Sequence, residues 1–186
     1  LRGRIGKRGL TATPCLDGLQ PGTFDCVYSL NVLEHLQDDR DWVRRLWALL
    51  RPGGLFHIYV PAFTILYSPF DRSIGHLRRY SRRRGQDLFR EPDAEIKTCV
   101  YRDVGGFFVA LLFRILARRG ADRPAPGALR FYDRWVVGFN RILDPLLGRF
   151  LGKNLLMVVR KGGCARGSCD READGPRSTC PERKRP

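Results

Sequence analysis

The sequence predicts an α/β domain built on a parallel sheet. Two apolar segments rich in β-forming residues, "FDCVYSLNVL" (24–33) and "LFHIYVPAF" (55–63), read as buried strands. Between them, residues 38–50 place apolar side chains at helical spacing. A strand, a helix and a second strand form a βαβ unit, which implies parallel strands with helices on the faces of the sheet.

The helix between these strands has a clear start and end in the sequence. Acidic residues open it at 38–41, where they suit the positive end of the helix dipole. "RPGG" (51–54) should end it, because Pro cannot continue a helix and Gly accepts the left-handed cap.

The remaining elements are weaker in pattern. We expect a short strand at 10–15, a weak helix at 81–91 and strands at 94–102 and 154–161. Residues 104–118 are densely apolar, and residues 129–151 are amphipathic with Pro145 as an interruption. We therefore divide the chain into a main domain, a helical insert or lid, the last strand of the sheet and a tail that should be disordered: 1–101, 102–152, 153–162 and 163–186.

The composition excludes some classes of function. The net charge of +15 comes from 29 Arg against 5 Lys, a ratio typical of a GC-rich genome, and no nucleic-acid-reading module is present. We expect no specific nucleic-acid partner. Three of the six Cys lie beside apolar runs and three lie in the tail without a fourth ligand, so a zinc site is a poor match. No segment reads as a signal peptide or a membrane span, and we expect a reducing cytoplasm.

Polar residues follow the first buried strand. Ser29, Leu30 and Asn31 stand at its carboxyl end, the edge at which open α/β sheets bind ligands. The alternative is a core strand with a polar end, followed by a Glu34–His35 pair that caps the next helix.

The segment "SPFDRSIGHLRRYSRRR" (68–84) is unusually polar and basic. Arg78 and Arg79 could donate to a carboxylate or phosphate. His76 could act as a base near neutral pH, Tyr80 could orient a hydroxyl, and Asp71 could hold His76 or Arg79 in position. The alternative is a salt-bridged loop that pins this segment to the sheet.

Several short motifs resemble the class I S-adenosylmethionine-dependent methyltransferases when taken in order. These are "FD" at 24, "LEH" at 33–35, "LRPGG" at 50–54 and the strand that follows. "DRSIGHLRRYS" (71–81) resembles the D-x-x-x-G-H-x-R-R-Y segment of a subgroup related to the type-11 and ubiquinone-biosynthesis enzymes. The resemblance covers residues 11–162.

The resemblance implies a Rossmann-like sheet, S-adenosylmethionine as cofactor, and a small-molecule, glycan or lipid-linked acceptor. It places cofactor contacts at Asp17, Ser29, Leu30 and Asn31. It places catalysis at His76 with Asp71, and acceptor contacts at Arg78, Arg79, Tyr80 and His35.

Two family features lack a counterpart in this sequence. Ubiquinone-type relatives bind a divalent metal with the help of a Glu at the place of Asn31, so we expect no metal. The Glu/Asp-x-Gly-x-Gly turn that approaches the cofactor, with its strand, is also missing. We therefore interpret the chain as the C-terminal portion of a longer enzyme and expect it to bind the cofactor weakly by itself.

A second class of function uses the 104–151 region and the Arg-rich surface. The chain would then be a non-catalytic basic module that binds a membrane surface or a partner protein. For 104–118 itself, we favour a helix packed on the sheet over a lid or a shallow membrane-contacting helix. Nucleic-acid methylation would need a motif such as Asn-Pro-Pro-Tyr at the strand end, and "SLNVLEH" does not provide one.

Overall fold

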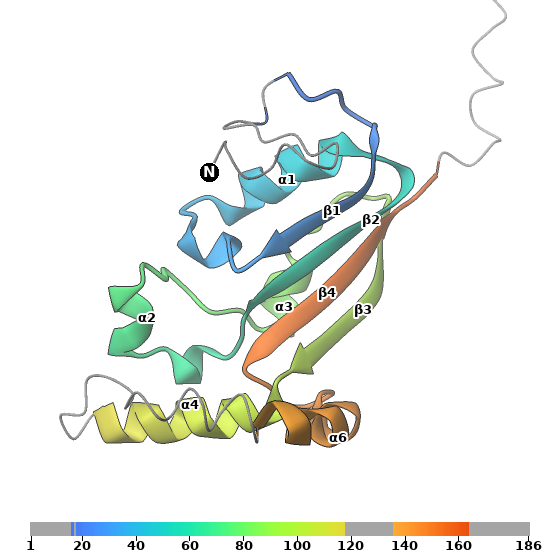
Figure 1. Ribbon diagram of the computed structural model, residues 1–186. Helices are drawn as coiled ribbons and strands as arrows, with labels where there is room; N and C mark the ends of the chain where they lie inside the picture. Colours follow the sequence, from blue (N-terminus) through green and yellow to red (C-terminus); the bar gives the residue numbers. More distant parts are fainter. Residues whose placement is uncertain (1–15, 17, 118–135, 164–186) are drawn as a thin grey trace, which may run out of the picture.

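The computed structural model describes residue 16, residues 18–117 and residues 136–163, which build a mixed four-stranded sheet with helices around it (Figure 1). The strand order is β1 (Phe24–Leu30), β2 (Leu50–Pro61), β4 (Asn154–Lys161) and β3 (Ala94–Arg102). β1 and β2 are parallel, whereas β4 is antiparallel to both of its neighbours, β2 and β3. The predicted α/β, Rossmann-like fold is confirmed for these residues, but only β1 and β2 form the predicted parallel pair and the sheet is mixed.

The predicted βαβ unit is present, with one difference. Helix α1 (Asp39–Leu49) starts at the N-cap Asp38, whose carboxylate accepts a hydrogen bond from the Asp41 N–H at 2.8 Å. The helix ends before Pro52 as predicted, but β2 already begins at Leu50 rather than at residue 55. The sheet includes the "RPGG" segment because the register shifts between Phe24 and Cys26 and Gly53 adopts a positive φ of 83°.

One face of the sheet carries the core. Helices α1 and α3 (Arg82–Gln86) cover this face, on which Val27 pairs with Phe56 and Ile58 with Met157. A Cβ on Gly85 of α3 would lie 2.5 Å from Met157 Sδ, so this helix packs directly on β4. On the other face, the rings of Tyr28 and His57 stack at 4.8 Å and Tyr28 is largely exposed.

Short elements follow the carboxyl ends of β1 and β2. β1 ends at Leu30 rather than at residue 33, because Asn31 takes a positive φ of 51° and turns the chain. The 3₁₀ turn η1 (Leu33–His35) follows β1, and η2 (Thr64–Leu66) and α2 (Pro69–Ser73) follow β2. The helix expected at 81–91 is only the short α3.

Two helices lie side by side beyond one end of the sheet (Figure 1). They are α4 (Val104–Ala117) and α6 (Val137–Leu147), and Pro145 lies inside α6 without ending it. Within the described part of the chain, no helix has the length and apolar content needed to cross a membrane.

Some predictions fall on residues that the structure does not describe, namely 1–15, 17, 118–135 and 164–186. They include the strand at 10–15, the cofactor contact at Asp17 and the disorder of almost all of the tail. The division of the chain at 101, 152 and 162 stays a prediction.

Candidate active site

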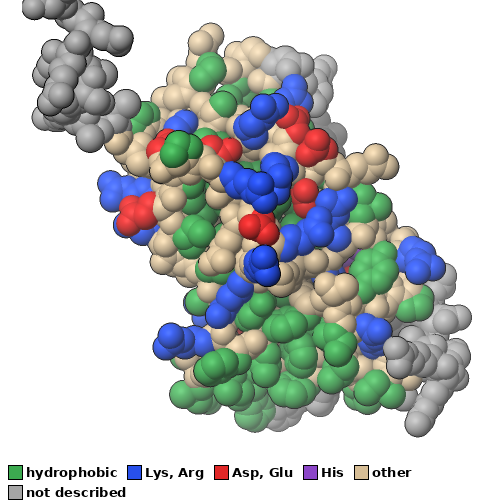
Figure 2. Space-filling view, turned by 180° about the vertical axis from the view of Figure 1, so that it is seen from behind, with side chains coloured by type: hydrophobic (Ala, Val, Ile, Leu, Met, Phe, Trp, Pro, Cys, Tyr) green, Lys and Arg blue, Asp and Glu red, His purple; other side chains and the backbone are tan. Residues whose placement is uncertain are grey.

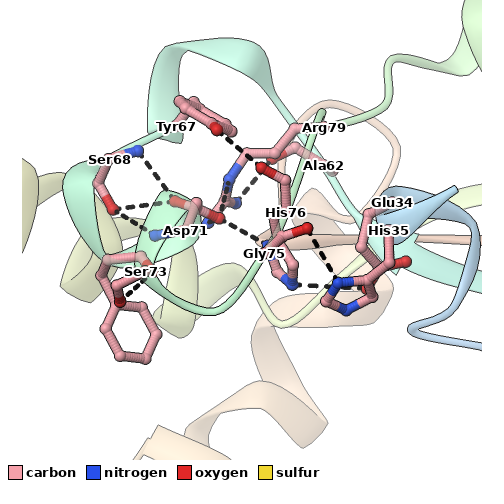
Figure 3. A network of polar contacts seen from close by, with 11 residues as sticks. Glu34, His35, Ala62, Tyr67, Ser68, Asp71, Ser73, Gly75, His76 and Arg79 are labelled. Atoms are coloured by element: carbon pink, nitrogen blue, oxygen red, sulfur yellow. Dashed lines mark hydrogen bonds and ion pairs between the residues drawn. The ribbon is translucent and has the colours of Figure 1, made fainter. Parts of the chain in front are cut away.

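The two motif segments meet at the carboxyl edge of β1 and β2 (Figure 3). The Leu77 N–H donates to the Glu34 carbonyl at 2.8 Å, and His35 Nδ1 lies 3.1 Å from the Gly75 carbonyl oxygen. A parallel bridge between Ala62 and Tyr80 fixes the end of the segment to the chain that leaves β2. The fold thus brings the "LEH" turn and the "GHLRRY" segment into contact.

Asp71 is the hub of this cluster and is completely buried. Its Oδ1 accepts a hydrogen bond from Arg79 Nε at 3.0 Å, forms an ion pair with Arg79 Nη2 at 2.8 Å, and lies 2.9 Å from His76 Nδ1. Burial by itself would raise the pKa of Asp71, but the hydrogen bond to His76 and the charge of Arg79 outweigh it, so that the pKa is lowered. Asp71 is therefore an ionised carboxylate at neutral pH.

The local sequence explains why Asp71 is held so firmly. Ser68 and Asp71 form a capping box at the start of α2, with Pro69 at the first helical position. Asp71 Oδ2 accepts from both the N–H and the Oγ of Ser68 at 2.9 Å. The carboxylate is thus fixed by its own helix before it contacts His76.

The Asp71 carboxylate also fixes the protonation of His76. Because an ionised carboxylate can only accept, Nδ1 of His76 must carry the proton and donate it. In the neutral ring Nε2 then keeps its lone pair, and it faces Glu34 Oε1 at 3.7 Å. A carboxylate that orients an imidazole in this way prepares the other ring nitrogen to act as a base.

Glu34 is an unusual neighbour for this imidazole. Its side chain is fully buried, and neither carboxylate oxygen has a hydrogen-bond partner among the described residues. Burial raises the pKa of Glu34, and the partly opposing effects of its own backbone N–H and of His76 do not cancel the rise. A buried carboxyl group left without hydrogen bonds is costly and is typical of functional sites.

Three side chains in this cluster could together hold a metal ion. Glu34, His35 and His76 each offer one ligand atom, and these atoms lie within 4.8 Å of one another. His35 and His76 both direct Nδ1 toward an oxygen acceptor, an arrangement common among metal-bound imidazoles. Two imidazoles and a carboxylate suit an ion such as Zn²⁺ better than Mg²⁺. The sequence-based expectation of no metal weighed Glu34 and His35 with Asn31 as the third position. His76 lies 41 residues after His35, so the spacing of residues along the chain could not show that it joins Glu34 and His35.

The three residues that follow Leu77 make most of their contacts with the protein itself. Tyr80 is completely buried and donates its hydroxyl to Asp39 Oδ2 at 2.7 Å. Arg79 is also buried, and besides Asp71 it donates to the Ala62 carbonyl at 3.1 Å. Their predicted contact with an acceptor therefore has little geometric support, and the alternative of a salt-bridged loop describes these two residues better.

Arg78 lies at the surface end of the same network. Its guanidinium donates to Asp39 Oδ2 and to the Gln37 carbonyl, both at 3.0 Å, while one fifth of the side chain stays exposed. Asp39, which the sequence suggested only as a helix-start acid, thus joins α1 to this segment. No feature of the sequence marked it as a partner of Tyr80.

The expected cofactor contacts lie at the same edge of the sheet. Ser29 is buried, and its Oγ has no hydrogen-bond partner among the described residues. Leu30 is more than half exposed, and Asn31 is exposed with its N–H bound to the Tyr59 carbonyl at 2.8 Å. An unpaired hydroxyl and exposed residues at the end of a strand fit a bound ligand at this edge.

Comparisons with known proteins find similarity over parts of the chain. Residues 3–56 match the family model described as a methyltransferase domain. The chain is 36% identical over 61 residues to an uncharacterised protein of Mycobacterium tuberculosis, a stretch that covers 32% of this chain and 21% of that protein. It is 32% identical over 82 residues to the trans-aconitate 2-methyltransferase of Deinococcus radiodurans, covering 39% of this chain and 32% of that enzyme.

These matches are partial. They span about a fifth to a third of the length of the curated relatives. Among solved structures, an S-adenosylmethionine-dependent methyltransferase of Archaeoglobus fulgidus aligns with a TM-score of 0.44 and 15% identity, covering 78% of this chain and 63% of that chain. The structure of a [4+2]-cyclase, SpnF, aligns with a TM-score of 0.41 and 15% identity over 82% of this chain and 53% of that one.

Proposed function

We propose that the protein is an S-adenosylmethionine-dependent methyltransferase. The observation that carries this proposal is the match of residues 3–56 to a methyltransferase domain. It is supported by the site, where the polar end of β1 and the Asp71–His76 pair lie at one edge of the sheet. A purely non-catalytic module is not favoured, because it would leave this match unexplained.

The residues of the site fit methyl transfer to a hydroxyl. When bound, the cofactor supplies an electrophilic methyl group on a sulfonium, and we assign Ser29, Leu30 and Asn31 to its methionine side. His76 Nε2 would take the proton of the acceptor hydroxyl, whose oxygen receives that methyl group. Asp71 stabilises the imidazolium that results.

The acceptor side is formed by the more accessible part of the cluster. His35 is exposed and Arg78 is partly exposed, so these two residues can meet an acceptor, whereas Arg79 and Tyr80 position the segment. We retain a small molecule, a glycan or a lipid-linked sugar as acceptor, in the cytoplasm and without a specific nucleic-acid partner. Trans-aconitate, the substrate that names the Deinococcus relative, belongs in the panel of test acceptors.

The test uses the protein as its gene encodes it. Calorimetry should detect S-adenosylmethionine binding, and a methyl label should pass from the cofactor to a member of the panel. Asn31→Gly keeps the positive φ but removes the side chain, and we expect at least a tenfold loss of cofactor affinity. His57→Ala, on the other side of the sheet, should change nothing. Absence of any cofactor binding would overturn the proposal.

A further inference from the structure

Helices α4 and α6 each expose a stripe of large apolar side chains. The spacing is i, i+4, i+7 on α4 and i, i+3, i+7 on α6, so each stripe follows one side of its helix. All six side chains are between 47% and 66% exposed: Phe108, Leu112, Ile115, Phe139, Ile142 and Leu146. We call the surface that they form the α4–α6 face.

The two helices are locked together at their N-terminal turns. The Gly105 N–H donates to Asn140 Oδ1 at 2.8 Å, and a Cβ on Gly105 would lie only 2.6 Å from Val136. The two helices are therefore in direct contact at these turns, and Figure 2 shows hydrophobic side chains gathered over the end of the molecule where they lie.

Among the described residues of α4, α6 and the turns beside them, acidic and basic side chains are placed differently. The two acids, Asp103 and Asp144, face inward: Asp144 accepts from the N–H groups of Asp103 and Val104 at 3.1 and 3.0 Å, and Asp103 accepts from Gly106 at 2.9 Å. Arg114 lies in α4, Arg141 in α6 and Arg149 just after α6, and Figure 2 shows Lys and Arg side chains beside the hydrophobic ones at this end of the molecule. An apolar face flanked by Arg side chains is complementary to an anionic lipid surface.

The face is also joined to the candidate active site. The Phe63 ring lies 5.3 Å from the Phe107 ring of α4 and 4.5 Å from that of Tyr101. The Phe63 N–H in turn donates to the Tyr80 carbonyl at 3.0 Å, within the segment that holds His76. If the α4–α6 face binds to another surface, that surface will lie next to the edge of the sheet that carries the candidate active site.

We propose that the α4–α6 face binds the surface of an anionic membrane, with its apolar stripes among the lipid headgroups. This docking places the site at the lipid surface and selects a lipid-linked acceptor, an extension that rests on the proposed methyl transfer. The sequence favoured a helix packed on the sheet at 104–118; Phe107 of α4 contacts Phe63, while three large apolar residues on another side of the helix are exposed.

The test is sedimentation of the protein with lipid vesicles. Wild type should bind mixed phosphatidylcholine–phosphatidylglycerol vesicles at least tenfold more tightly than phosphatidylcholine alone, and salt should weaken the binding. The double variant Leu112→Glu/Ile142→Glu should lose at least tenfold in affinity, and Arg141→Glu should lose a smaller part. Tyr28→Glu adds one negative charge at an exposed residue of β1, leaves Arg114 and Arg141 unchanged, and should bind as wild type does.

Three outcomes would overturn the docking proposal. They are no preference for anionic vesicles, full binding by the double variant, or a dimer in size-exclusion chromatography that the double variant abolishes, since the last would show that a second copy covers the face. The double variant should still bind S-adenosylmethionine and methylate a soluble acceptor. If the wild-type protein binds vesicles but transfers no methyl group, the proposed function and its lipid-linked acceptor are wrong, whereas the docking proposal stands.

Discussion

His76 is held from one side by Asp71, whose Oδ1 lies 2.9 Å from Nδ1, and faces the buried Glu34 carboxyl from the other, with Oε1 3.7 Å from Nε2. The two carboxyl groups have opposite character. The pKa of Asp71 is lowered by its hydrogen bonds and by Arg79, whereas burial raises the pKa of Glu34. The His76 imidazole thus lies between the ionised Asp71 carboxylate and the Glu34 carboxyl group, whose own protonation is favoured by burial.

Replacing Asp71 by Asn should impair catalysis more than cofactor binding. The amide can accept from His76 or donate to it, so the ring loses its fixed tautomer, and we expect turnover to fall by about a hundredfold or more. The measurement is kcat and KM for both substrates, together with the cofactor affinity by calorimetry. A variant that keeps turnover but loses cofactor affinity would contradict the assignment.

The sequence contained enough to predict much of this fold but only part of the site. The apolar patterns of helix α1 and of strands β1 and β2 are clear in the sequence, so these elements could be predicted from it, although β1 ends at Leu30 and not at residue 33. The start of β2 could not be predicted in this way. It depends on a shift in register against β1, which allows Pro52 and Gly53 to lie within the strand.

The pairing of Asp71 with His76 could be proposed from sequence because the two residues are close in the chain. The contact of Glu34 with His76 and that of Tyr80 with Asp39 could not, because both depend on how distant segments meet at the sheet edge. For the same reason, the sequence did not distinguish a buried Tyr80 from one that meets an acceptor.

Tyr80→Phe should destabilise the protein by about 1–3 kcal/mol. It removes the hydroxyl that donates to Asp39 and leaves a buried carboxylate oxygen with fewer partners. Urea unfolding measures the change, and Tyr28→Phe at an exposed ring is the matched control. Equal stability of the two variants would show that the bond to Asp39 contributes nothing.

Stability should fall in acid. Burial would raise the pKa of Asp39, as of Asp71, but hydrogen bonds and neighbouring Arg charges lower both below the usual 3.8. A carboxyl group with a lowered pKa in the folded state stabilises the protein above its unfolded pKa, and this contribution is lost as pH falls below that value. Urea unfolding between pH 5 and pH 3 should show a steeper loss for wild type than for Asp71→Asn.

The contribution of Glu34 to stability should depend on pH in the direction opposite to that of Asp39 and Asp71, and Glu34→Gln tests this. Because the pKa of Glu34 is raised from 4.5, the stability that it contributes is present below that value and is lost as pH rises through the folded pKa. The variant removes this loss, so its stability relative to wild type should increase from pH 4.5 toward pH 8. Thermal unfolding in the presence of a chelator measures the effect, and a relative stability that decreases over this range would contradict it.

Two glycine substitutions should have opposite effects. Gly85→Ala should destabilise the protein by about 1–3 kcal/mol, because the new Cβ would meet the buried side chains of Met157 and Leu155. Gly138→Ala has no atom within 4 Å of its Cβ and lies in α6, so it should stabilise by about 0.5–1 kcal/mol. If Gly85→Ala were as stable as wild type, the packing of α3 on β4 would be wrong.

The most direct test of the proposed function is a single turnover of methyl transfer with His76→Ala in the complete protein, saturated with S-adenosylmethionine. The account predicts a rate at least a hundredfold below wild type at neutral pH, with an unchanged affinity for the cofactor. A rate equal to that of wild type would contradict the assignment of His76 as the base and the site built around it.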